Sequence, residues 1–139
     1  MIEAHSFFLY YSNSTKNMKY SPSYIPFDKV SEEKGTIQLK IRNGKLYDPP
    51  GNVVFFDEII GNSTFKLYRN PELELIFEQN NYNNGRREAR INLKNMGLPQ
   101  ALDIISIWNK NHITLSVGDR NNKSNSSTSV GEWSIKKVD

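Results

Sequence analysis

Apolar and polar residues alternate along much of the chain, and a period of two predicts β-strands. In residues 36–42, every second side chain is isoleucine or leucine and those between are polar. Residues 72–78 and 87–93 repeat this pattern. The polar segment between them, 79–85, ends in Asn-Gly, a dipeptide typical of hairpin turns. We therefore expect these two strands to pair.

The same alternation predicts a second hairpin from residues 103–108 and 112–117. Further strands are predicted at residues 5–12, 52–57, 64–69 and 131–138. Eight or nine short strands bounded by Gly, Pro, Asn and Ser are typical of a sandwich of antiparallel sheets. The fold class predicted from the pattern is all-β.

Three segments depart from the strand pattern. A turn is the only helical candidate, at residues 95–101, where Gly97 and Pro99 oppose a long helix. Residues 20–26 are predicted to form an extended connection, because residues that precede proline avoid the helical region. Residues 121–129 are polar and of low complexity, so we expect a mobile loop there.

The composition of the chain indicates a single domain and argues against several classes of protein. The 139 residues suit one domain, 1–139, and 18 basic against 15 acidic residues give a net charge of only +3, which argues against a nucleic-acid-binding surface. No apolar run approaches a membrane span, and no cysteine is present for disulfides, thiolate metal ligands or thiol catalysis. We expect a cytoplasmic protein if Met1 is the natural start, and an extracellular one if the chain is an excised domain.

Four segments, taken in order, resemble the laminin-G-like domains of the concanavalin A-like superfamily. They are residues 35–42 with Gly-Thr-Ile, 53–57 with Val-Val-Phe-Phe-Asp, 73–77 with Leu-Glu-Leu-Ile-Phe, and the hairpin 105–119. In the hairpin, Trp108-Asn109 stands where the family has Trp-Asp, and Gly118-Asp119 is in swapped order. Residues 131–138 are also similar to the final strand of galectins, whose sugar-binding set is not found together on this chain.

This resemblance implies a jelly-roll β-sandwich, with two antiparallel sheets. It also implies binding of carbohydrate or protein by a curved face or by rim loops, in some members with calcium. It does not imply an enzyme.

Sugar binding requires an aromatic platform for the pyranose ring, with amide or guanidinium groups for the hydroxyls. The Asn-rich segment 80–84 and the arginines after it contain this mixture, with Tyr82 as the leading residue, and the indole beside Asn109 is a second candidate. The predicted ligand-binding residues are Tyr82, Asn81, Asn83, Asn84, Arg86, Arg87 and Trp108.

The sequence offers no defined site for calcium or for catalysis. Loop oxygens for calcium are available from Asp57, Asp119, Asn80, Asn81 and Asn83, although no Asp-rich spacing defines a site. The two histidines, His5 and His112, have no partners at the spacing of a metal site or a catalytic triad. We predict no catalytic residues and no resident metal, with calcium left open.

The run of Glu72, Glu74 and Glu78 is similar to the acidic strand of glucanases in the same superfamily, but an apolar residue stands where the third acid belongs. We expect these carboxylates to pair instead with Arg87 or Arg90.

The sequence thus favours a non-catalytic module that binds a glycan or glycoprotein. The alternative is a protein–protein interaction or structural module, including self-association through sheet edges such as residues 53–56. A small glycoside hydrolase comes third.

Overall fold

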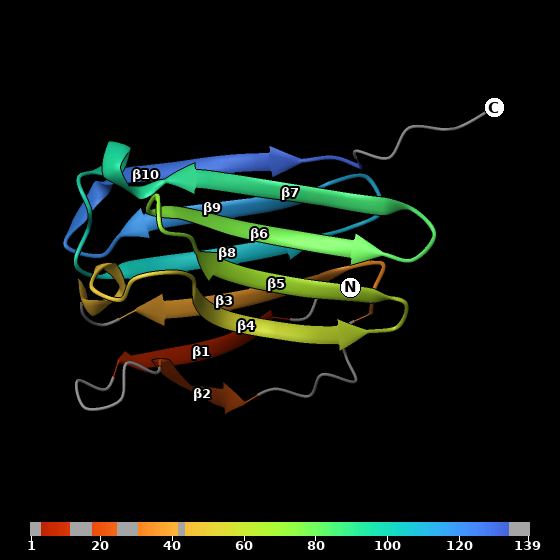
Figure 1. Cartoon of the computed structure of the whole chain (residues 1–139), viewed down its shortest axis with the longest axis horizontal. Helices are drawn as coiled ribbons and strands as arrows, with labels where there is room; N and C mark the ends of the chain where they lie inside the picture. Colours follow the sequence, from red (N-terminus) through yellow and green to blue (C-terminus); the bar gives the residue numbers. More distant parts are fainter. Residues whose placement is uncertain (1–3, 12–17, 25–30, 42–43, 134–139) are drawn as a thin grey trace.

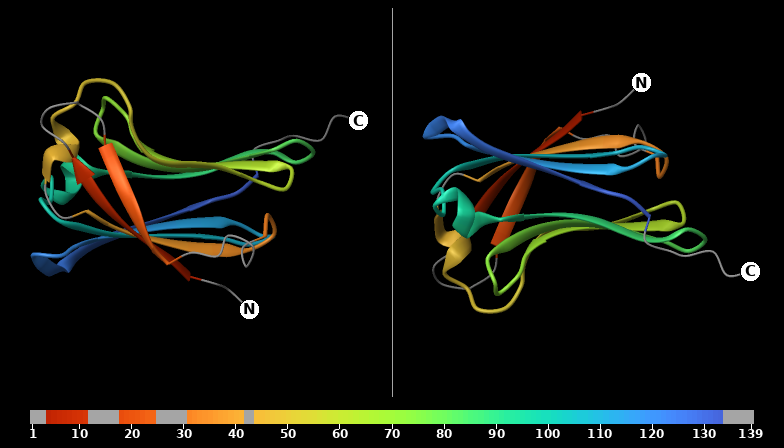
Figure 2. Two further views of the ribbon diagram at one scale, coloured as in Figure 1. Left: turned by 90° about the horizontal axis from the view of Figure 1, so that it is seen from below. Right: turned by 90° about the horizontal axis from the view of Figure 1, so that it is seen from above.

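Two β-sheets lie face to face in the structure, a computed structural model that describes residues 4–11, 18–24, 31–41 and 44–133. Figure 1 shows the four-stranded sheet in front of the six-stranded one, and Figure 2 shows the two layers edge-on. The predicted all-β class and the sandwich are confirmed.

The six-stranded sheet has the order β10-β9-β8-β3-β1-β2. Its strands are β1 (Ala4–Tyr11), β2 (Met18–Tyr24), β3 (Gly35–Ile41), β8 (Leu102–Trp108), β9 (Ile113–Asp119) and β10 (Asn122–Gly131). The predicted β8–β9 hairpin is confirmed by their antiparallel pairing.

One pair in this sheet is parallel, whereas the sequence predicted antiparallel sheets throughout. Strands β1 and β3 run in the same direction, because the chain passes from β1 to the outermost strand β2 before it reaches β3. In the extended connection predicted at 20–26, residues 20–24 are extended but belong to strand β2, and residues 25 and 26 lie outside the described residues. The proline of β2, Pro22, is tolerated because an outer strand leaves one row of backbone groups outside the ladder.

The four-stranded sheet is an antiparallel meander with the order β4-β5-β6-β7. Its strands are β4 (Val53–Ile60), β5 (Ser63–Arg69), β6 (Glu74–Asn81) and β7 (Gly85–Asn92). The predicted pairing across the Asn-Gly segment is confirmed, with Leu75 opposite Ile91 and Phe77 opposite Ala89. Residues 53–56 lie on an edge strand, as the self-association alternative requires.

The core lies between the sheets because alternation turns the apolar side chains of both inward. At its centre the rings of Phe65 and Trp108, from opposite sheets, lie with their centroids 4.4 Å apart. Phe77 packs against both rings. Burial of this kind stabilises by roughly 25 cal/mol per Å² of apolar surface removed from water.

Strand β10 corrects the mobile loop predicted at 121–129. Its side chains are mostly exposed, and its order comes from backbone pairing with β9, which an edge strand obtains without apolar residues. Two side-chain contacts add to that pairing: Asn125 Nδ2 donates to the carbonyl oxygen of Met96 (2.8 Å), and the hydroxyls of Ser116 and Thr128 lie 3.2 Å apart. The predicted strand 131–138 lies outside the described residues from residue 134 onward.

Two short 3-10 helices, η2 (Gly44–Tyr47) and η3 (Leu93–Met96), are the helical elements of the described chain. The second begins just before the predicted turn at 95–101. The Asn92 side chain accepts hydrogen bonds from the backbone N–H groups of Lys94 and Asn95, and Gly97 ends η3 with φ of 80°.

Candidate functional site

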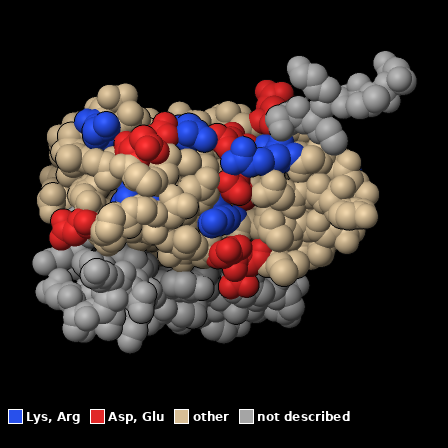
Figure 3. Space-filling model, viewed as in Figure 1, with Lys and Arg blue, Asp and Glu red and all other residues tan. Residues whose placement is uncertain are grey.

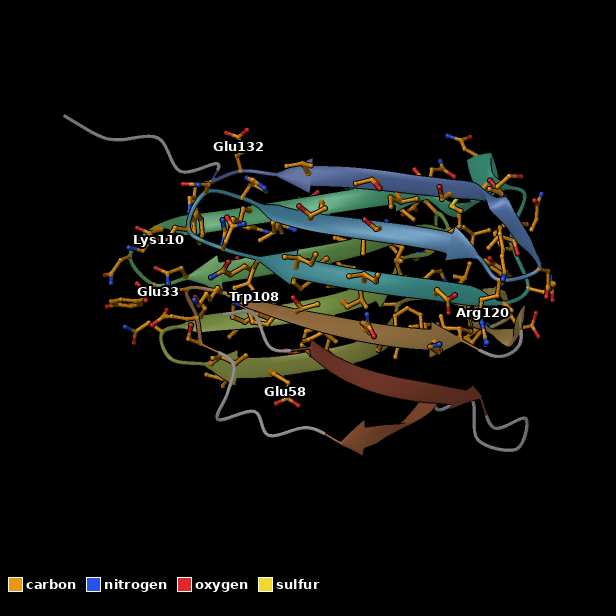
Figure 4. All side chains as sticks on the ribbon, turned by 180° about the vertical axis from the view of Figure 1, so that it is seen from behind. Glu33, Glu58, Trp108, Lys110, Arg120 and Glu132 are labelled. Atoms are coloured by element: carbon orange, nitrogen blue, oxygen red, sulfur yellow. The ribbon has the colours of Figure 1, made fainter. Side chains whose placement is uncertain are left out.

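A cleft of about 810 Å³ lies at the end of the sandwich that carries the β4–β5 and β6–β7 turns. We call it the end cleft. Its walls are residues 60–62, Gln79, Asn81, Asn83, Asn84 and Arg87 from the four-stranded sheet and its turns, and residues 31–33, Asn109, Lys110 and Trp133 from the other sheet and its flanking segments. Figure 4 shows Glu33 and Lys110 together at this end, with Arg120 at the opposite end.

Asn81 shapes the tip of the β6–β7 hairpin and also faces the cleft. Its Oδ1 atom accepts hydrogen bonds from the backbone N–H groups of Asn83 (2.8 Å) and Asn84 (2.9 Å), an arrangement that asparagine makes readily in turns. Its Nδ2 atom donates to Glu32 Oε2 (3.0 Å) and to Ser63 Oγ (2.8 Å). One side chain therefore ties the turn to both walls.

The Glu32 carboxylate is held on the opposite wall by neutral donors. Its Oε2 atom accepts from Ser63 Oγ (3.2 Å) as well as from Asn81. The chain passes very close at Gly61, where an added Cβ atom would meet the Glu32 carboxylate, and the φ of Gly61 is +62°. Glycine at this turn thus leaves the space that the carboxylate occupies.

Arg87 lies on the floor of the cleft, with only 2% of its surface exposed. Its Nε atom donates to Gln79 Oε1 (2.8 Å) and its Nη2 atom to the carbonyl oxygen of Asn109 (2.6 Å). Gln79 in turn donates from Nε2 to Ser63 Oγ (2.8 Å). A continuous polar network therefore runs from Arg87 through Gln79 and Ser63 to Glu32.

Trp133, which follows β10, covers the guanidinium of Arg87. The guanidinium carbon lies 4.3 Å from the centroid of the indole ring, at the distance of a cation–π contact. Burial lowers the pKa of Arg87 to about 10, so the side chain still carries its charge at neutral pH. The cleft thus brings together an aromatic ring, a buried cation, a carboxylate and several amides.

Four of the seven predicted ligand-binding residues line this cleft: Asn81, Asn83, Asn84 and Arg87. Tyr82, the predicted leading residue, is 91% exposed at the tip of the turn and lies outside the cleft walls. Arg86 also lies outside them. It points to the outer face of the sheet, where it pairs with Glu78 (2.7 Å) and Glu88 (2.5 Å).

Trp108 is a correction to the predicted site. Its side chain is fully buried, packs against Phe65 and Phe77, and donates from Nε1 to the carbonyl oxygen of Ser31 (2.8 Å). An indole with no exposed surface has no face to offer a ligand. Its part in the cleft is indirect, because it positions the wall that carries Glu32.

Glu32, Gln79 and Trp133 were not among the predicted ligand-binding residues. Asn109 was named only beside Trp108 in the second sugar-binding candidate, and Lys110 only as part of the connection between two strands. A signal for the cleft floor was present in the alternation. Gln79 and Arg87 occupy inward positions of β6 and β7 where apolar residues are the rule, and a polar pair facing inward indicates a satisfied buried network or a binding site. Trp133 carried no comparable signal, because it lies in the strand predicted at 131–138, where an aromatic residue is ordinary.

The outer face of the four-stranded sheet carries the acidic run considered for catalysis. Arg90 pairs with Glu74 (2.8 Å) and Glu88 (2.6 Å), while Arg86 bridges Glu78 and Glu88. Acidic and basic side chains therefore alternate on this face, as Figure 3 shows. The predicted pairing of Glu74 with Arg90 is confirmed, whereas Arg87 faces inward and takes no part in it.

The described part of the chain shows neither a cluster of metal ligands nor a membrane-spanning helix. No group of three or more His, Cys, Asp or Glu side chains there is placed to hold a metal ion. No helix in that part is long and apolar enough to cross a membrane.

Comparison with protein-family models, curated proteins and solved structures finds no match for this chain.

Proposed function

We propose that the chain is a non-catalytic binding module that takes a carbohydrate in the end cleft. The observation that carries the proposal is the meeting of Trp133, Arg87, Glu32 and the amide side chains of Asn81 and Asn83 around one cavity. A half-buried indole suits the apolar face of a pyranose, and carboxylate, amide and guanidinium groups suit its hydroxyls. The cavity volume is within the usual range of ligand sites, roughly 300–1,000 Å³.

The membership of a concanavalin A-like or laminin-G-like family is part of this proposal, supported by the two-layer sandwich. The proposal also includes the jelly-roll order of strands that the resemblance implies. Consecutive strands are neighbours from β4 to β7 and from β8 to β10, so the support comes from the architecture rather than from the strand order. Binding at a single rim site is typically weak, and useful avidity would come from several copies or from attachment to a larger protein.

The third alternative, a glycoside hydrolase, has less support. Glu74 and Glu78 stand on the outer face and are engaged by arginines, away from the cleft where a sugar chain would lie. Glu32, the carboxylate inside the cleft, is bound by Ser63 and Asn81.

The test is a glycan-array screen of the folded protein, with and without calcium, followed by titration of the hits. Trp133→Ala and Asn83→Ala are expected to weaken binding at least about tenfold, because they remove the stacking face and a cleft amide. Tyr82→Ala is the matched control, since Tyr82 is exposed on the same turn and outside the cleft. Loss of binding in Tyr82→Ala with unchanged binding in Trp133→Ala would contradict the proposed site and favour the turn tip.

A second candidate, self-association, is favoured by the edge strand β4. Its outward residues Ile59 and Val54 are 76% and 38% exposed, and its outer backbone edge has no hydrogen-bonded neighbour within the four-stranded sheet. Sedimentation velocity over a range of concentrations tests this alternative. A dimer in the native chain that dissociates in Ile59→Lys would support it, and a monomer at all concentrations would contradict it.

A further inference from the structure

Two arginines are buried in the four-stranded sheet, and their hydrogen bonding differs. The Arg69 guanidinium makes four hydrogen bonds to backbone carbonyl oxygens, from Leu46, Pro49, Gly51 and Asn70. Arg87 makes two, and its Nη1 atom is buried without any hydrogen-bond partner among the described residues. Every nitrogen of the Arg69 guanidinium therefore donates a hydrogen bond, whereas Arg87 has one buried nitrogen that donates none.

The donors of Arg87 that lack a partner lie on one defined edge of the guanidinium. A guanidinium carries five N–H donors on a rigid fork. Gln79 and Asn109 take the edge formed by Nε and Nη2, which leaves the edge that contains Nη1. Within the part of the chain that the structure describes, no carboxylate lies within ion-pair distance of Arg87.

The nearest network carboxylate does not supply this partner. Glu32 is separated from Arg87 by two intervening side chains, Ser63 and Gln79, and its Oε2 atom is bound to neutral donors. The cleft therefore has an acidic wall at Glu32 and a cationic floor at Arg87 that are not paired with each other. Lys110 adds a second, exposed positive charge at the rim, where its Nζ atom lies 4.0 Å from Glu33 Oε2.

We propose that the end cleft recognises a carboxylate group, which binds the Nη1 edge of Arg87 while the rest of the ligand contacts the amides and Glu32. This inference rests on the proposed function when the carboxylate belongs to a sugar acid, such as a uronic acid. The same chemistry is offered by the free carboxyl terminus of a peptide, and the experiment separates the two sources. A carboxylate matches the planar fork of an arginine with two parallel hydrogen bonds.

Trp133 controls access to this edge. The Nη1 atom is shielded from water, and the indole lies directly over the guanidinium. A carboxylate that binds there displaces the ring or slides beneath it, so binding changes the environment of Trp133. Trp108, the other tryptophan of the chain, is buried in the core and serves as a constant background.

The test is a titration of the native chain with digalacturonic acid, followed by tryptophan fluorescence and calorimetry. Its dimethyl ester, in which both carboxyl groups are esterified, is the matched neutral ligand, which keeps the hydroxyls and loses the charge. An N-acetylated dipeptide with a free carboxyl terminus and its amide form the peptide arm. We expect the acid to bind at least about tenfold more tightly than the ester, with a fluorescence change that disappears in Trp133→Phe.

Variants then assign the contact to Arg87. Arg87→Lys keeps the charge without the planar fork and is expected to abolish the preference for the acid, while Arg86→Gln, its exposed neighbour, is expected to preserve it. The comparison of acid with ester in the native chain does not depend on whether an Arg87 variant folds.

The outcomes separate this inference from the proposed function. Equal binding of acid and ester would overturn the carboxylate inference and leave carbohydrate binding in place. Binding of the free-carboxyl dipeptide alone would support carboxylate recognition and overturn carbohydrate binding. Absence of binding by all four ligands would overturn the carboxylate inference, and the glycan array would then decide the proposed function by itself.

Discussion

The indole nitrogen of Trp108 donates a hydrogen bond to the carbonyl oxygen of Ser31, 2.8 Å away and on a different segment of the chain. This contact joins the centre of the core to the wall of the end cleft, because the next residue is Glu32. The Ser31 hydroxyl continues the link by accepting from the backbone N–H groups of Glu33 (3.3 Å) and Lys34 (3.2 Å).

Trp108→Phe removes that hydrogen bond and leaves a small void while keeping an aromatic ring in the core. We expect a loss of about 1–3 kcal/mol in the free energy of unfolding, from the unsatisfied Ser31 carbonyl and the lost contacts. Urea denaturation monitored by circular dichroism measures it. An unchanged midpoint would show that the Ser31 carbonyl finds another partner at no cost.

Gly131 allows strands β7 and β10 to approach each other. A Cβ atom at this position would fall on the carbonyl oxygen of Glu88, so Gly131→Ala must push the two strands apart. We expect destabilisation of about 1–3 kcal/mol. Gly118→Ala is the control, because no atom lies within 4 Å of its added Cβ and its φ is not positive. Equal thermal midpoints for the two variants would contradict the close approach.

Arg69 fastens the loop of residues 46–51 to the end of β5 through three of its four carbonyl contacts. Arg69→Met keeps most of the side-chain length and removes the donors, which leaves buried carbonyl oxygens unsatisfied. We expect a loss of roughly 3 kcal/mol or more, since hydrogen bonds from charged donors contribute about 1.5–3 kcal/mol each. Hydrogen exchange should show faster opening of residues 46–51; protection equal to that of the native chain would contradict this role.

The carboxyl group of Glu78 is expected to make the stability of the fold depend on pH in the acid range. Burial tends to raise the pKa of its carboxyl group, but donors from Arg86, Tyr68 and Asn80 outweigh it and hold that pKa below its ordinary value of 4.5. The folded state therefore binds this proton less readily than the unfolded state. The stabilising contribution is present above pH 4.5 and is lost as the pH falls through the folded pKa.

Glu78→Gln is expected to flatten the pH dependence of the unfolding free energy below about pH 4.5, since a neutral amide does not titrate. Denaturation curves between pH 3 and 7 measure it. Asp57→Asn, on the edge strand β4, is the comparison for removal of one exposed carboxylate. A native and a Glu78→Gln profile of the same shape would contradict the lowered pKa.

The strands with unbroken alternation could be predicted from the sequence, because a half-buried antiparallel strand displays its two faces directly in the order of residues. This holds for β3, and for β6 and β7 with the exceptions of Ile76, which is apolar on the outer face, and of the inward polar pair Gln79 and Arg87. Strand β10 could not be predicted by the same signal. It is an edge strand with polar side chains on both faces, and its stabilising contacts are backbone hydrogen bonds that leave no mark in the composition.

The orientation of Trp108 was ambiguous for a related reason. Strand β8 reads Leu-Asp-Ile-Ile-Ser-Ile-Trp, so both of its faces carry isoleucines and neither is clearly the inward one. The structure turns Leu102, Ile104 and Trp108 inward.

For the candidate site, the Asn-rich turn and Arg87 could be predicted from residue type alone. The other wall could not, because it comes from segments distant in sequence, 31–33 and Trp133, that meet only when the sheets stack.

The pairing of β3 with β8 also sets an order for folding. The four strands between them form a meander of consecutive hairpins, each closed by a short loop, whereas β3 must wait until the whole meander and β8 have been made. Closing such a long loop lowers the entropy of the chain, and only the contacts of the completed sheet offset that loss. On a ribosome, the β4–β7 hairpins would therefore form while β3 still has no antiparallel neighbour, and the two walls of the end cleft would meet only after β8, β9 and β10 have been made.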